Sequence, residues 1–128
     1  MGVQSLNEEL KKRILNRRET NQQVRKTIRL LKNAQILTIC ENMLALPTQT
    51  EEDLINMLRF YNETRPNRLS LYFIRYYPKT EIIHTALEHN ILTAEDVEDI
   101  NRGLNARSFI QGGTIQEKAF AKIQGFLT

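Results

Sequence analysis

The chain has 128 residues, of which 41% are hydrophobic and 26% charged, and 18 Lys or Arg against 15 Asp or Glu give a formal net charge of +3. This length suits one globular domain, and the composition excludes a disordered chain. No apolar run approaches the roughly 20 residues of a membrane helix, so we expect no membrane partner. The single cysteine excludes an internal disulfide and favours an intracellular protein, cytoplasmic or, in a eukaryote, nuclear.

Glycine and proline are sparse and unevenly placed. No glycine occurs between Gly2 and Gly103, and the prolines are Pro47, Pro66 and Pro78. Hairpin turns favour Gly, Asn-Gly or Asp-Gly, and neither dipeptide occurs in the sequence, whereas isolated prolines suit breaks between helices. We therefore predict an all-α fold, a compact helical bundle of about five to seven helices with a long, basic N-terminal helix or helix pair.

The predicted elements follow in chain order. Helices are expected at 5–19, 21–45, 50–62, 67–77, 80–90, 93–102 and 114–127, with a short turn near 105–111. Residues 5–45 could form one helix or two, since Thr20 with Gln23 could cap a fresh start. The stretch "LSLYFIRYY" has β character, but a lone strand would lack a partner, so it is assigned to a helix. Asn90 and Gly103 are the expected left-handed helix stops.

Charge divides the chain into two parts. Residues 1–32 carry nine basic and three acidic residues, a net of +6, whereas residues 33–128 carry nine basic and twelve acidic, a net of −3. We therefore expect a basic N-terminal helical arm at 1–32 and a compact helical domain at 33–128. Such asymmetry suits either a polyanion or association with an acidic protein surface.

The arm is the main candidate binding site. Rows of Lys and Arg favour binding to nucleic-acid phosphates, because each neutralised phosphate releases counterions. The alternative is a solvated helix face, or a basic seam that pairs with an acidic partner or a second copy of the chain. The candidate nucleic-acid contacts are Lys11, Lys12, Arg13, Arg17, Arg18, Arg25, Lys26, Arg29 and Lys32.

A second candidate interface mixes basic and aromatic side chains, a combination that can bind single strands or form a protein interface. Ordinary core packing with solvated arginines is the competing interpretation. Tyr76 and Tyr77 are the members expected to be most exposed. The set comprises Arg65, Arg68, Tyr72, Arg75, Tyr76 and Tyr77.

Catalytic templates fit poorly. His84 and Glu88 could share a metal, but no further His or Cys completes a zinc set, and Cys40 reads as a core residue. We expect no catalytic residue, metal or cofactor. The function predicted is a non-catalytic helical nucleic-acid-binding or replication/transcription accessory protein. The alternative is a helical adaptor or assembly protein that acts through protein–protein contacts or homo-oligomerisation.

Overall fold

The computed structural model describes residues 1–104 and falls into two compact units. Unit 1 comprises Met1–Met43 and Glu51–Tyr72. Unit 2 comprises Leu44–Thr50 and the described residues from Phe73 on. The turn and helix expected beyond residue 104 lie outside the described residues. The division of the chain after residue 32 stays a prediction.

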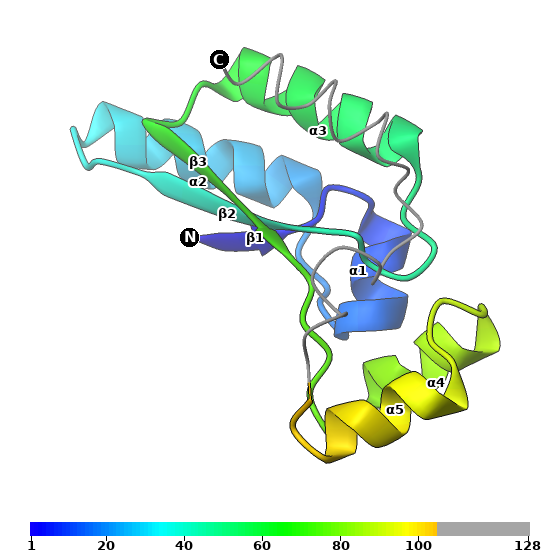
Figure 1. The fold of residues 1–128 in the computed structure, drawn as a ribbon. Helices are drawn as coiled ribbons and strands as arrows, with labels where there is room; N and C mark the ends of the chain where they lie inside the picture. Colours follow the sequence, from blue (N-terminus) through cyan, green and yellow to red (C-terminus); the bar gives the residue numbers. More distant parts are fainter. Residues whose placement is uncertain (105–128) are drawn as a thin grey trace. The chain divides into compact units, whose positions relative to one another are not determined.

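The fold is α/β, so the prediction of an all-α bundle is wrong. Three strands form one sheet in the order β1-β2-β3: β1 (Gly2–Gln4), β2 (Ile39–Leu44) and β3 (Arg68–Phe73) (Figure 1). β1 pairs with β2 in parallel. β3 also runs parallel to β2, with hydrogen bonds from Arg68 N to Thr38 O at 3.1 Å and from Ile74 N to Leu44 O at 2.9 Å.

The error has a physical reason. Missing hairpin signals exclude tight antiparallel turns, but parallel strands are joined by helical crossovers that need no such turn. Left-handed turn positions here are held by residues other than glycine, among them Asn16, Gln35 and Arg65. The apolar run after residue 33 is consequently a strand preceded by a loop, and "LSLYF" is another strand rather than a helix.

The crossovers are helical. α1 (Glu8–Leu15) and α2 (Asn21–Asn33) connect β1 to β2, and α3 (Glu51–Thr64) connects β2 to β3. α1 ends at Asn16, whose φ of 50° is left-handed, so the N-terminal region forms two helices. α2 starts with the Thr20–Gln23 capping box, in which Gln23 N donates to Thr20 Oγ1 at 3.2 Å.

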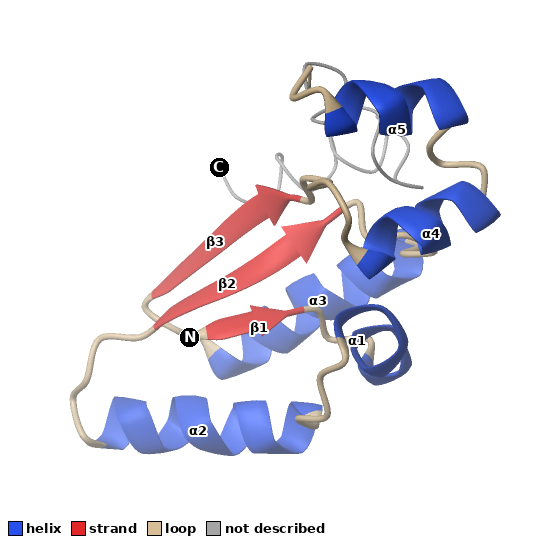
Figure 2. Cartoon of the chain, turned by 90° about the horizontal axis from the view of Figure 1, so that it is seen from below, coloured by secondary structure: helices blue, strands red, loops and turns tan. Residues whose placement is uncertain are grey.

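α2 and α3 cover the same face of the sheet (Figure 2). Buried side chains recur at helical spacing, Val24 and Ile28 on α2 and Leu54, Met57 and Phe60 on α3. In β2 burial alternates, with Cys40, Asn42 and Leu44 buried. Asn42 Nδ2 donates to Tyr61 Oη of α3 at 2.8 Å, which fixes this strand face toward the helices.

Unit 2 holds α4 (Glu81–Glu88) and α5 (Ala94–Asn101). Thr93 caps α5 by accepting from Asp96 N at 3.1 Å. Asn90 and Gly103 adopt φ of 54° and 79°, so both predicted left-handed stops are confirmed. Among residues 1–104, no helix is long and apolar enough to cross a membrane.

Candidate ligand-binding face of the sheet

Within the described residues of unit 1, no helix covers the other face of its sheet. Parallel sheets are ordinarily covered on both faces. Because side chains alternate along a strand, the residues opposite Cys40 and Asn42 lie here. Tyr72 and Ile39 are 55% and 43% exposed on it. We call this surface the open face, and its members are Gly2, Ile39, Glu41, Met43, Arg68, Ser70 and Tyr72.

The order of the strands indicates which class of α/β fold the open face belongs to. Neighbouring strands follow each other in sequence, and α2 and α3 lie on one side of the sheet, whereas α1 lies beyond the carboxyl end of β1 (Figure 2). α/β barrels are wound in this way, whereas doubly wound sheets reverse their order and carry helices on both faces. In a barrel the helix-free face points to a packed interior, and ligands bind where the strands end, at their carboxyl ends.

Gly2 lies beside polar side chains on the open face. A Cβ at Gly2 would lie 2.7 Å from Gln4 Nε2 and 3.7 Å from Arg17 Nη1. Gly2 is paired in register with Glu41, which places Glu41 on the same face of the next strand. Gln4 itself has a φ of 67°, an unusual conformation for a residue with a side chain. An amide and a guanidinium therefore flank a position that lacks a side chain.

The Arg17 guanidinium lies next to the charged side chains of Glu19 and Lys11. Its Nε lies 2.8 Å from Glu19 Oε1, and the same oxygen lies 3.9 Å from Lys11 Nζ. Lys11 is fully buried, and its Nζ has no hydrogen-bond partner within the described residues. Burial lowers the pKa of Lys11, while the Glu19 carboxylate opposes that shift. We call Gln4, Lys11, Arg17 and Glu19 the Arg17 cluster.

A hollow of about 550 Å³ adjoins the Arg17 cluster. The residues that line it come from α1 and from the loop before α2, and both charge signs are present, so the hollow suits a zwitterionic ligand better than a simple anion. Its lining residues are Glu8, Glu9, Lys12, Arg17, Arg18 and Glu19.

The nine predicted phosphate contacts do not form one arm. Lys11 is buried, Arg17 and Arg18 lie in the loop between α1 and α2, and the others lie on those two helices. Arg25 is held at 2.9 Å by Glu63 Oε2 and lies 4.7 Å from the Phe60 ring centroid. Lys12, Arg13, Lys26, Arg29 and Lys32 are exposed.

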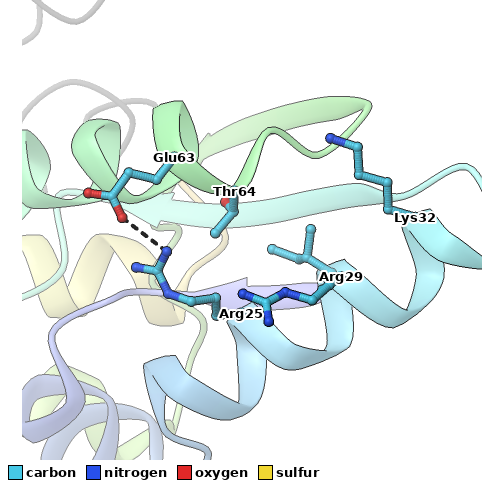
Figure 3. Close-up of a pocket in the computed structure, with 6 residues that line it drawn as sticks. Arg25, Arg29, Lys32, Glu63 and Thr64 are labelled. Carbon is cyan, nitrogen blue, oxygen red and sulfur yellow. Dashed lines mark ion pairs between the residues drawn. The ribbon is translucent and has the colours of Figure 1, made fainter.

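A smaller hollow of about 180 Å³ lies between α2 and α3, close to the Arg25–Glu63 ion pair (Figure 3). α2 contributes Arg25, Ile28, Arg29 and Lys32, and α3 contributes Glu63 and Thr64. This hollow lies on the helical side of unit 1 rather than on the open face. Binding of this basic helix to an acidic protein or to a second copy of the chain stays a prediction.

The second predicted set is scattered as well. Arg68 and Tyr72 lie in β3, and Arg65 precedes that strand with its Nε donating to Asn62 O at 3.1 Å. Arg75, Tyr76 and Tyr77 belong to unit 2. Tyr77 is 56% exposed as predicted, but Tyr76 is fully buried, so that prediction is wrong.

Sequence reasoning missed Gly2, Gln4 and Glu41. Their signal was available as an isolated early glycine in "GVQ" and as polar–apolar alternation in "ICENML". Both stretches were assigned to predicted helices or to the residues that flank them. Only the strand assignment brings these residues to one face.

Comparison with known proteins gives one family. Residues 1–61, from β1 to most of α3, match the model of the Radical SAM superfamily. No curated protein matches the chain. The match is to an enzyme superfamily, so the predictions of a non-enzyme, a regulatory nucleic-acid-binding accessory protein and a helical adaptor are wrong.

The similarity implies S-adenosylmethionine and an iron–sulfur cluster, which together belong to radical chemistry. Iron–sulfur clusters are held by several cysteine thiolates. The 128 residues contain only Cys40, which is fully buried on the strand face toward α3. No three His, Cys, Asp or Glu side chains gather as a metal site within residues 1–104. This chain by itself therefore does not fit the cluster.

Proposed function

We propose that this chain is a cofactor-binding part of a radical-SAM type enzyme, and that its open face holds S-adenosylmethionine beside Gly2. The singly wound order of the sheet, the residues beside Gly2 and the family similarity over residues 1–61 all support this proposal. The single observation that carries it is the Arg17 guanidinium lying 3.7 Å from the space where a Gly2 side chain would be.

The residues of the open face suit the chemical groups of this cofactor. A guanidinium pairs with a carboxylate through two parallel hydrogen bonds, so Arg17 suits the carboxylate of the methionine part. Carboxylate and amide oxygens accept from ammonium or ribose hydroxyl groups, which suits Glu41 and Gln4. A ligand could approach the Gly2 backbone closely once the Gln4 amide, 2.7 Å from the ideal Cβ position, moves aside. Radical chemistry on S-adenosylmethionine needs an electron from an iron–sulfur cluster, which this chain by itself does not fit, so its residues are assigned only to binding and orienting the cofactor.

Calorimetric titration of the full chain with S-adenosylmethionine tests the proposal. Arg17→Gln is expected to weaken binding roughly 10- to 100-fold, because a hydrogen bond to a charged group contributes about 1.5–3 kcal/mol. Lys26→Gln is the control, since Lys26 is an exposed cation on α2 that lines neither of the two hollows. The proposal fails if the wild-type chain shows no binding at millimolar cofactor, or if Arg17→Gln binds as tightly as the wild type.

A further inference from the structure

The amino group of Lys11 is a buried cation without a hydrogen-bond partner among the described residues. Its side chain is 0% exposed, and no hydrogen-bond acceptor within the described residues reaches its Nζ. An ammonium has three donors, and removing it from water without acceptors is costly. Two carboxylates are near enough to act on it, those of Glu19 and Glu8. Glu8 Oε1 already accepts from Asn21 N at the start of α2.

Glu19 therefore lies between two cations. One of its oxygens is 3.9 Å from Lys11 Nζ and 2.8 Å from Arg17 Nε. Glu19 Oε1 accepts no hydrogen bond within the described residues, so its contacts with Lys11 and with Arg17 are both ion pairs. Because Lys11 is buried and cannot swing into solvent, it fixes the position of the Glu19 carboxylate, and the carboxylate in turn restrains Arg17.

The backbone adds a second restraint from the same residue. Arg17 N donates to Lys11 O at 3.1 Å, and the left-handed Asn16 turns the chain at the end of α1. The backbone of Arg17 is thus fixed by α1, while its guanidinium depends on side chains. Arg17 is 37% exposed, so without Glu19 its long side chain would sample many rotamers.

We propose that Lys11 and Glu19 are positioning residues that hold the Arg17 guanidinium over Gly2 on the open face. The inference rests on the proposed function for the identity of the ligand, but the arrangement of the three charges is independent of it. Lys11 acts through Glu19 and does not itself touch the ligand.

Nuclear magnetic resonance of the Arg17 Nε–H group tests the arrangement without any ligand. In the wild-type chain this signal is expected to be distinct from that of exposed arginines such as Arg18, and Lys11→Met is expected to move it to their position. Glu19→Gln, which leaves α1 untouched, should have the same effect, whereas the matched control Lys12→Met should have none. An Arg17 signal unchanged in both Lys11→Met and Glu19→Gln overturns the inference.

Titration with S-adenosylmethionine then separates this inference from the proposed function. Lys11→Met and Glu19→Gln are each expected to weaken binding about ten-fold, as removal of a supporting residue does around other sites. The double variant should be no weaker than either single variant, because both act through Arg17. If Arg17→Gln loses binding but Lys11→Met and Glu19→Gln retain it, the positioning role fails alone. If the wild type does not bind, the proposed function fails, and the resonance measurement still decides the arrangement.

Discussion

Gly2 is the residue on which the geometry of the open face depends most directly. Gly2→Ala is expected to weaken S-adenosylmethionine binding, because the new Cβ would occupy space 2.7 Å from Gln4 Nε2 and 3.7 Å from Arg17 Nη1. The loss of stability should be small, under roughly 0.5 kcal/mol, since the close atom is the end of a flexible side chain. Calorimetric titration and urea unfolding measure the two effects.

The control for Gly2→Ala is Gly103→Ala. Gly103 has a φ of 79° and no heavy atom within 4 Å of an added Cβ, so its substitution is costly only through backbone conformation. We expect a loss of about 1 kcal/mol in stability and no change in binding. The opposite pattern, with Gly2→Ala binding normally, would show that the space beside Gly2 is not used.

The buried Tyr76 is expected to lower the stability of the folded chain at alkaline pH. Burial raises the pKa of Tyr76 from 10.0 to about 12, and burial also raises the pKa of Tyr61. The unfolded state loses these protons first, so stability is fully present below pH 10 and is lost as pH rises toward about 12. At roughly 1.4 kcal/mol per pKa unit, Tyr76 accounts for about 2–3 kcal/mol.

Urea unfolding between pH 9 and pH 12 checks the pH effect. Tyr76→Phe should lower the slope of stability against pH in this window without abolishing it, because Tyr61 still titrates in the same direction. Tyr77→Phe is the matched control, since Tyr77 is exposed. An unchanged slope in Tyr76→Phe would contradict the assignment of the effect to this side chain.

At the scale of elements, α2 depends on its first turn. Thr20 N donates to Gln23 Oε1 at 2.8 Å, and Gln23 N donates to Thr20 Oγ1 at 3.2 Å, so the capping box satisfies two amides. Thr20→Ala is expected to destabilise the chain by about 1 kcal/mol. Thr20→Ser should retain most of the stability because it keeps the hydroxyl.

Urea unfolding monitored by far-ultraviolet circular dichroism measures this loss. Since α2 covers the sheet with Val24 and Ile28, its weakening should lower the stability of the whole of unit 1 rather than fray one end. Equal stability of the Ala and Ser variants would show that the hydroxyl does not cap the helix.

At the scale of the whole molecule, the rate at which the Cys40 thiol is labelled measures whether β2 stays covered. Its thiol is fully buried on the strand face toward α3, and burial raises its pKa. Labelling by a thiol reagent should therefore be slow in native conditions and should follow unfolding as urea is added. Reconstitution of the chain alone with iron and sulfide should give no cluster absorbance, in the wild type or in Cys40→Ala. Fast labelling of the native chain would show that β2 is not covered as described.

Much of the local structure could be predicted from the sequence. The left-handed Asn90 and Gly103 depend on contacts within a few residues, and both were predicted. The Thr20–Gln23 box is equally local, and the structure selects two helices where the sequence allowed one or two. The helical spacing of Val24 and Ile28 is equally local, and the structure buries both on α2. Where an element depends on hydrogen bonds to residues far away in the sequence, the same reasoning failed to predict it.

The strands are the clearest case. "ICENML" and "LSLYF" have no local turn signal, because their hydrogen bonds are made to strands reached through a helix. The sequence by itself determined the capped starts of α2 and α5, the basic character of α1 and α2, and the presence of only one thiol. Tertiary structure alone decided that Lys11 is buried, that Arg17 lies beside Gly2, and that Glu41 shares their face, because side-chain direction follows from strand pairing and not from spacing along the chain.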